Sequence, residues 1–309
     1  MGRHKLLLYH LVAFVTVVVW GSTFVFTKLL LLSGLSSAHI FTLRFAVAYV
    51  LLLAFSLTRK SHRWLSLSWR DELLMLALGV TGGSLYFIAE NEALRYTTTT
   101  NVSLIVCSCP LVAAILISLF YRSQRLGSLQ MAGSLLAALG VAVVVLNGRF
   151  VLHLSPAGDA LALVANVCWA VYSLLMIPAQ QPRPSAYGST RQQHYDAVFI
   201  TRKVFFYGLL TMIPYYIIAD DPLSLRPLLD VHVLANLLFL GCIASMACFL
   251  AWTWVMDKLG TLTVTNYVYV NPVSTIFFAW WVLSEPITPF FLIGTVLILA
   301  GMYLADRKR

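Results

Sequence analysis

Two carboxylates stand inside an otherwise apolar run of the chain. Glu90 and Glu92 belong to the stretch Tyr86-Phe87-Ile88-Ala89-Glu90-Asn91-Glu92-Ala93. An ionisable side chain at membrane depth costs several kcal/mol unless a partner compensates it, and residues two apart cannot share one helix face. We expect Glu90, nearer the middle of its run, either to serve a solute or a proton or to be held by a structural ion pair or hydrogen bond. For Glu92 we expect the structural role.

Two arginines occupy matching places in separate apolar runs. Phe41-Thr42-Leu43-Arg44 is matched by Phe199-Ile200-Thr201-Arg202. A long arginine side chain can reach the membrane surface from inside such a run. The alternative is a pair of gating cations, with Arg44 near the outer mouth of a cavity and Arg202 near the inner mouth. Lys28 is a further cation inside a run, and an ion pair between Lys28 and Glu90 is the alternative to a titrating Glu90.

Several amphipathic side chains lie too deep in their runs for the interfacial belt in which Trp and Tyr gather. Three tryptophans do so, and Tyr172 follows Trp169 by three residues, which places both on one helix face. Amide side chains in the same runs need hydrogen-bond partners, which either neighbouring helices or a polar solute would provide. We expect one central, water-accessible substrate site lined by Trp20, Glu90, Asn101, Trp169, Tyr172, Trp252 and Asn266.

Prolines interrupt two of the runs at matching places. Pro110 and Pro272 each remove a backbone donor and free a carbonyl group, which lipid tolerates only where protein or water satisfies the freed group. A harmless kink is one interpretation. A hinge or a bend that faces the substrate is the other, and it is favoured by the occurrence of proline at both places.

Motifs of enzymes and pumps are missing from the sequence. It has no Gly-x-x-x-x-Gly-Lys-Ser/Thr loop, no dinucleotide fingerprint, no nucleophile elbow and no His-Glu-x-x-His helix. The five cysteines all lie in apolar runs, where a thiol behaves as a small hydrophobic group. We therefore expect a protein that is not an enzyme, with no cofactor and no metal site.

Composition identifies the elements that must position these residues. Of the residues, 60% are hydrophobic and only 11% are charged, so the surrounding solvent must be lipid. A membrane-spanning helix needs roughly 20 mostly apolar residues. Ten runs meet that need, at approximately 8–31, 39–58, 72–94, 98–121, 127–147, 157–178, 197–219, 231–256, 260–283 and 287–305. The sequence predicts an all-α integral membrane protein with ten transmembrane helices.

The second half of the chain repeats the first, at residues 1–150 and 151–309, with five runs in each. Because five is odd, the second copy enters the membrane from the opposite side, and inverted repeats of this kind are typical of transporters with alternating access. Small residues mark the fifth and tenth runs, with Gly133 and Gly140 matching Gly294 and Gly301. They predict that these two helices pack against each other along a seam. A homodimer interface is a further use that this seam could have.

The net charge of +9 is explained by topology. Fourteen basic residues fall in the loops on the side of both termini and three on the other side, so the positive-inside rule predicts cytoplasmic termini. Anionic lipid headgroups account for the charge without any nucleic acid.

The run Trp20-Gly21-Ser22-Thr23-Phe24-Val25-Phe26-Thr27-Lys28 resembles the first-span signature of EamA-type members of the drug/metabolite transporter superfamily. The segment Glu92–Tyr96 with the threonines of Thr97–Thr100, Pro110, the Ser284-Glu285-Pro286 turn, and Gly294 with Gly301 also fit. The resemblance implies a ten-helix, exporter-like fold with a central cavity, and efflux of amino acids or other small metabolites. Two departures are Ser123-Gln124, where the first repeat would often carry a glutamate, and a long linker at 178–196.

We therefore expect a secondary transporter that exports a small metabolite, such as an amino acid, across a bacterial cytoplasmic (inner) membrane. Its partners would be that solute and membrane lipids, with protons and a second copy of the chain as open alternatives. An uncoupled solute or lipid translocator is the competing hypothesis, followed by a membrane scaffold that transports nothing.

Overall fold

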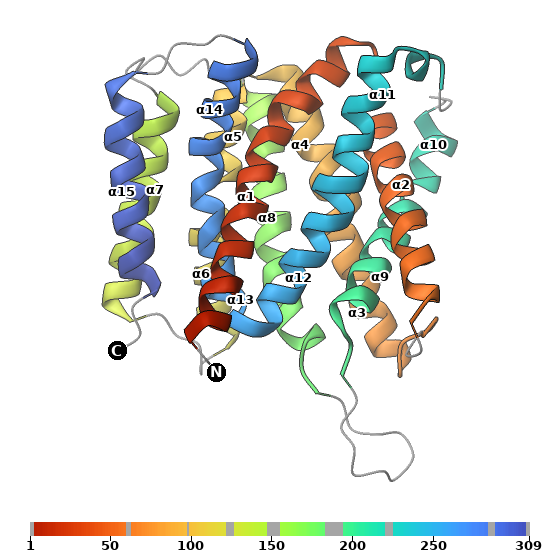
Figure 1. Ribbon diagram of the computed structural model, residues 1–309, viewed down its shortest axis with the longest axis horizontal. Coiled ribbons are helices and arrows are strands. Elements are labelled where there is room, and N and C mark those ends of the chain that lie inside the picture. The colour runs from red at the N-terminus through yellow and green to blue at the C-terminus, as the bar shows by residue number, and fades with distance from the viewer. Residues whose placement is uncertain are drawn as a thin grey trace.

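The computed structural model describes residues 3–59, 63–97, 99–121, 127–146, 155–182, 194–219, 225–283 and 288–306, and all regular elements among them are helical. The helices run side by side in one bundle (Figure 1). Six stretches are long and apolar enough to cross a membrane, namely His4–Leu32, Ser37–Leu57, Trp69–Tyr96, Pro156–Ala179, Ala197–Ile218 and Val231–Leu259. The described residues exclude Ser123-Gln124, Ser284-Glu285-Pro286, Thr98, most of the 178–196 linker and the side chain of Asn101.

The helices of the first half follow the predicted apolar runs. Serine side chains begin two of them, because Ser36 Oγ accepts from the backbone N–H of His39 and Ser68 Oγ from that of Asp71. In order they are α1 (Arg3–Leu32), α2 (Ser37–Leu57), α3 (Trp69–Gly79), the π-helix η1 (Val80–Ser84), α4 (Leu85–Tyr96), α5 (Thr99–Val106), α6 (Cys109–Phe120) and α7 (Ser128–Leu146).

The second half shows the same sequence of features. Ser155 and Asp196 cap the first two of its helices. The elements are α8 (Pro156–Ala179), α9 (Ala197–Leu210), α10 (Ile213–Ala219), the short 3₁₀ helix η3 (Arg226–Leu229), α11 (Val231–Leu238), the π-helix η4 (Phe239–Ala247), α12 (Cys248–Leu259), α13 (Thr261–Thr265), the 3₁₀ helix η5 (Asn266–Val270), α14 (Asn271–Leu283) and α15 (Pro289–Asp306). The third helical stretch of each half therefore contains a π segment, and the π-helices η1 and η4 pack against α9 and α2 respectively.

The two prolines begin helices after interruptions. Pro110 is in the first turn of α6, directly after the break at Cys107–Ser108, and Pro272 is the second residue of α14, after the 3₁₀ turns of η5. At the first break, Asn166 of α8 donates its amide N–H groups to the Ile105 carbonyl and to Ser108 Oγ. The interruption is tolerated because a neighbouring helix satisfies polar groups that it exposes. A hinge function for Pro110 and Pro272 stays a prediction.

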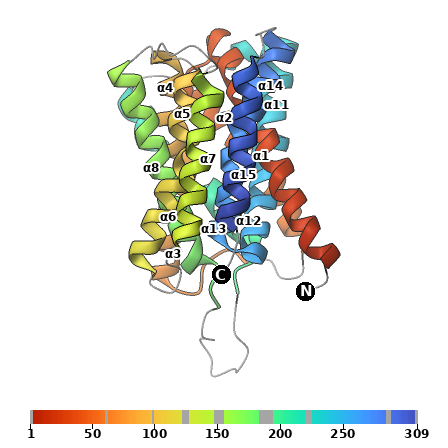
Figure 2. The same ribbon diagram turned by 90° about the vertical axis from the view of Figure 1, so that its left-hand side faces the viewer.

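The predicted glycine seam is confirmed between α7 and α15, which lie side by side in both views (Figures 1 and 2). A Cβ added to Gly133 would lie 2.4 Å from the Ala305 nitrogen, and one added to Gly301 would lie 2.4 Å from the Ala137 nitrogen. Gly140 and Gly294 face each other in the same way. The backbones approach so closely that only glycine fits, as lipid-embedded helices require when packing alone holds them together.

The core lies among the remaining helices, where aromatic side chains from both halves interlock. In α2, Phe41 and Phe45 contact each other, and both contact Phe87 of α4. From the second half, Phe249 of α12 contacts Phe45 and also contacts Phe205, which belongs to α9. Contacts between halves thus hold the bundle together around a central region that neither half encloses alone.

Candidate functional site

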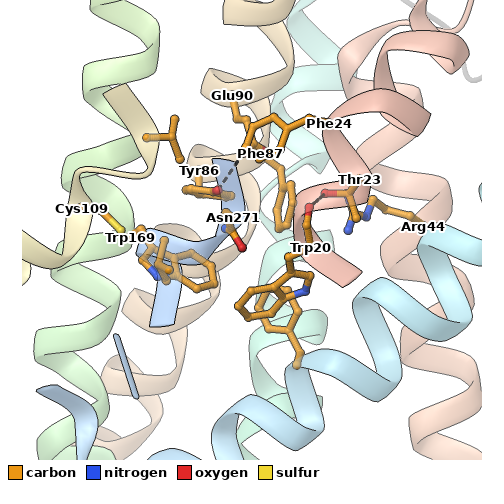
Figure 3. A pocket seen from close by; sticks show the side chains of 13 residues that line it. Trp20, Thr23, Phe24, Arg44, Tyr86, Phe87, Glu90, Cys109, Trp169 and Asn271 are labelled. Atoms are coloured by element: carbon orange, nitrogen blue, oxygen red, sulfur yellow. Dashed lines mark hydrogen bonds between the residues drawn. The ribbon is translucent and has the colours of Figure 1, made fainter. Parts of the chain in front are cut away.

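A cavity lies between helices of both halves (Figure 3), and about 30 Å³ of it is open to the centres of water-sized molecules. It is walled mainly by aromatic side chains, with a few polar groups among them, a composition typical of small-molecule sites. Its lining comprises Trp20, Thr23, Phe24, Arg44, Tyr86, Phe87, Glu90, Val106, Cys109, Trp169, Phe249, Val268 and Asn271.

Trp20 and Trp169 form one wall of the cavity. Their rings meet edge to face with centroids 5.3 Å apart, and the Trp20 indole N–H donates to the Ala244 carbonyl of η4 at 2.8 Å. That bond joins the first helix of the chain to the π segment of the second half. It fixes one indole, while the Trp169 indole N–H is buried and lacks a hydrogen-bond partner in the described part of the chain.

Glu90 reaches the cavity from α4 and is 7% exposed. The Tyr86 hydroxyl, one turn earlier on the same helix, donates to Glu90 Oε1 at 2.8 Å. Lys28, the ion-pair alternative weighed from the sequence, instead donates its ammonium group to the Leu94 carbonyl at 2.6 Å. A neutral donor, and not a neighbouring lysine, therefore holds this carboxyl group.

Arg44 also lines the cavity and is only 1% exposed. Its Nε donates to Ser245 Oγ of η4 at 2.9 Å, and its guanidinium lies 4.5 Å from the centre of the Phe87 ring. From the sequence, Arg44 is expected near the outer mouth of the cavity, but the structure places it in the cavity wall. The reason is that α2 packs against η4, which offers a hydroxyl partner inside the bundle.

Asn271 adds an unsatisfied acceptor to the same wall. It is 7% exposed, and its Oδ1 has no hydrogen-bond partner among the described residues. Buried polar atoms without partners are rare in native structures. Two residues of the cavity wall, Asn271 and Trp169, thus carry an acceptor and a donor without partners among the described residues, which suits the wall to a polar ligand.

Of the remaining predicted site residues, three are described with their side chains, and none of these three lines the cavity. Tyr172 and Trp252 are fully buried behind the cavity wall, with ring centroids 5.2 Å from Trp169 and 4.8 Å from Trp20 respectively. Asn266 is half-buried at the start of η5 and is not part of the lining. Asn101 belongs to α5, but its side chain lies outside the described residues.

The predicted site does not include Asn271, Thr23, Phe87 or Phe249, although Asn271 is one of the amides in apolar runs for which a polar solute is one of the two expected partners. A signal existed for two of them. Asn271 directly precedes Pro272, at the point where the helix resumes, and Thr23 lies one helical turn after Trp20. The phenylalanines carry no distinguishing signal in a chain with 18 of them.

A second polar cluster ties the halves together at the end of the bundle where α1 begins and α15 ends (Figure 1). Arg202 of α9 donates to Ser56 Oγ of α2 at 3.2 Å and to the Arg63 carbonyl. Next to it, the buried Lys203 forms an ion pair with Glu72 of α3. The Tyr207 hydroxyl donates to the same carboxylate oxygen at 2.6 Å. A buried charge is stable only with such partners, so this cluster holds α9 firmly to the first half.

No group of three His, Cys, Asp or Glu side chains within the described ranges is placed to hold a metal ion.

Glu92 and Arg95 form an ion pair of 3.1 Å at the exposed end of α4.

Comparison with known proteins gives consistent results. A family model described as the EamA-like transporter family matches residues 7–146 and again residues 156–305. An uncharacterized transporter of Archaeoglobus fulgidus is 27% identical over 97% of this chain and 98% of its own length. A probable amino-acid metabolite efflux pump of Salmonella typhimurium is 25% identical over 94% and 92%. A probable terminal-alkyne amino-acid exporter of Streptantibioticus cattleyicolor is 25% identical over 77% and 74%.

The fold itself is shared with a protein of known crystal structure. The TM-score is 0.71 over 96% of this chain and 97% of the other, at 19% sequence identity.

Proposed function

The chain belongs to the EamA-like transporter family, and from that premise we propose that it exports a small metabolite, such as an amino acid, by alternating access around the central cavity. Family membership and the apolar helices make it an integral membrane transporter and not an enzyme. The substrate, the direction and the mechanism are the proposed part. Two similar proteins are named for the efflux or export of amino acids or their metabolites, which supports the choice of substrate class.

One observation carries the proposal. The cavity lies between helices of both halves, and the residues that line it carry a buried guanidinium, a buried carboxyl group and an amide oxygen without a hydrogen-bond partner in the described ranges. In a membrane protein such groups are costly unless a solute or water meets them. A scaffold would gain nothing from keeping them.

Inverted repeats are the architecture that we propose for the movement. The family model matches the chain twice, the third stretch of each half contains a π segment, and the fourth stretch of each is interrupted just before a proline. Residues 1–150 and 151–309 would then be two five-span units that rock against each other. The bacterial cytoplasmic membrane, with both termini inside, is the proposed location.

The contacts between the halves support the proposed gating roles. Arg202 and Lys203 join α9 to α2, the 63–68 loop and α3, and these bonds would break when the cavity opens at the end that holds both termini. Arg44 keeps a gating role in the proposal because its bond to Ser245 also crosses between halves. Pro110 and Pro272 would act as the hinge points.

Transport assays with the purified full chain test the proposal. Proteoliposomes loaded with one labelled metabolite at a time, from a panel of amino acids and other small metabolites, are followed for release with and without a pH gradient. We expect release of at least one amino acid above that from protein-free liposomes. Faster release in the presence of the pH gradient supports proton coupling. Equal release with and without the gradient supports the uncoupled alternative. A folded protein that releases none of the panel contradicts the proposal.

A further inference from the structure

We propose that Arg44 binds the carboxylate of the transported solute and that Arg44, Glu90 and Asn271 together select a zwitterionic α-amino acid with an apolar side chain. The inference rests on the proposed function, because it takes the central cavity as the transport site. It goes further in assigning each pole of the solute to a residue and in predicting which analogues the site rejects.

Arg44 supplies the positive pole. Its Nε is occupied by Ser245 and its guanidinium face by Phe87, while its two terminal amino groups form no hydrogen bond or ion pair with any described residue. In the view of Figure 3 the side chain enters the cavity from the side opposite Trp169 and Cys109. A guanidinium with a free pair of donors matches a carboxylate in two parallel hydrogen bonds.

Glu90 supplies the negative pole from α4. Tyr86 donates to its Oε1, and its Oε2 accepts no hydrogen bond from the described part of the chain. Although Arg44 and Glu90 line one cavity, they form no ion pair with each other, since every described pair within 4.0 Å lies elsewhere. Opposite charges held apart in a shared space fit a solute that carries both charges.

Asn271 explains why the cationic pole should be an ammonium group. Its Oδ1 is buried without a donor from any described residue, and Asn271 is one of the residues that line the same cavity. An ammonium group has three donors, enough to serve Glu90 and Asn271 together. A quaternary amine would leave the amide oxygen unsatisfied, at the cost that any buried orphaned acceptor carries.

The rest of the wall determines the side chain of the solute. Phe24, Phe87 and Phe249 are buried around the cavity together with the rings of Trp20 and Trp169. Apolar surface buried against these rings contributes favourably to binding, whereas a second charged group on the solute would find no partner there. The site therefore favours leucine-like or phenylalanine-like amino acids over acidic or basic ones.

Binding to the purified full chain in lipid nanodiscs tests the assignment without requiring transport. The probes are L-leucine and L-phenylalanine, their amides, which lack the carboxylate, and 4-methylpentanoate and 3-phenylpropanoate, which lack the amine. Binding is followed as the rise in unfolding temperature with probe concentration. We expect at least one free amino acid to stabilise the protein, and its two analogues to need about 10- to 100-fold higher concentrations.

Variants assign the discrimination to Arg44. Arg44→Gln should bind the free amino acid and its amide equally while still rejecting the acid that lacks the amine. Arg95→Gln removes an exposed arginine that pairs with Glu92, and it should keep the full preference for the free acid. If Arg44→Gln does not fold, the comparison of amino acid with amide on the native protein still decides the question.

Three results would overturn the inference: no stabilisation by either free amino acid, equal binding of an amino acid and its amide by the native protein, or an unchanged preference in folded Arg44→Gln. Proteoliposome assays separate this failure from that of the proposed function. Export of a solute without a carboxylate refutes the role of Arg44 and leaves the transporter proposal standing. Selective amino-acid binding with no movement across the membrane supports the site and contradicts alternating access.

Discussion

At the scale of single residues, Glu90 is held in a place where a charge is hardest to keep. It is buried in the middle of the bundle and accepts one hydrogen bond from Tyr86. The titratable groups that line the cavity with it are Tyr86 on its own helix, Arg44 on α2 and Cys109 on α6. Its ionisation is therefore sensitive to whether the cavity holds water, solute or neither, which is the property that proton coupling needs.

Replacing Glu90 with glutamine tests that coupling. Glu90→Gln keeps the size of the side chain and removes the ionisable group, so we expect exchange at saturating substrate to persist while stimulation by a pH gradient is lost. The measurement is labelled-substrate flux in proteoliposomes, with and without the gradient. Glu92→Gln is the matched control, because that carboxylate pairs with Arg95 at the exposed end of the same helix. Gradient-driven flux that persists in Glu90→Gln would rule out the proton role.

At the scale of elements, two helix backbones can approach each other closely only where glycine leaves room. The packing of α7 against α15 depends on four such glycines. Introducing a Cβ at Gly140 places it 2.7 Å from the Ile298 nitrogen and 2.8 Å from the Gly294 oxygen. These neighbours are backbone atoms and cannot rotate away, so the helices themselves must separate.

Gly140→Ala should therefore destabilise the protein by about 1–3 kcal/mol, the range for an overpacked site, and lower its unfolding temperature in detergent. Gly127→Ala is the control, because a Cβ there would meet only Gln130 Oε1 at 3.7 Å. Equal unfolding temperatures for the two variants would show that the seam does not stabilise the fold.

The cluster around Glu72 is a second contact between elements, and a double-mutant cycle measures it. Lys203→Met leaves the Glu72 carboxylate without its cation, while the double change Lys203→Met with Glu72→Gln removes both charges. Removing one partner of a buried pair is more harmful than removing both. We expect the single variant to be less stable than the double variant by about 1–2 kcal/mol, as read from thermal unfolding. If the effects of Lys203→Met and Glu72→Gln, each measured alone, add up to that of the double variant, the pair contributes nothing to the stability of the fold.

At the scale of the whole molecule, the first helix begins and the last helix ends at the same end of the bundle (Figure 1). Arg59 and Arg63, which are among the basic residues of the predicted cytoplasmic loops, follow α2 and belong to that end. The connection between α1 and α2 lies at the other end and holds no lysine or arginine. The charge distribution and the fold thus agree on which loops share a side, and the positive-inside rule predicts that this side is cytoplasmic.

Single-cysteine labelling in intact cells checks the orientation. Ser33→Cys lies in the exposed turn after α1 and should react with a membrane-impermeant maleimide from outside, whereas Thr58→Cys, exposed after α2, should react only once the membrane is opened. The unmodified chain is the background control, since its five cysteines are buried or half-buried. Reaction of both positions from the same side would contradict the topology.

The sequence by itself determined the features that depend on local pattern. Apolar runs predicted where helices form, because burial in lipid leaves the backbone no alternative. Pro110 and Pro272 predicted where helices are interrupted, since proline lacks a donor wherever it occurs. The glycines of the fifth and tenth runs predicted a seam, because lipid offers no other drive for close packing.

Only the tertiary structure decided which deep side chains meet. It brought Trp20, Glu90 and Trp169 to one cavity, added Arg44 and Asn271, and placed Tyr172 and Trp252 behind the wall. The physical reason is rotation about the helix axis. Each residue advances an α-helix by about 100°, and the π segments η1 and η4 change that advance in the very stretches that carry Glu90, Ser245 and Trp252. The spacing of residues along the sequence therefore does not predict which helix face a residue occupies after such a segment. Likewise, Ser245 becomes the hydrogen-bond partner of Arg44 only because α2 packs against η4 in the folded bundle.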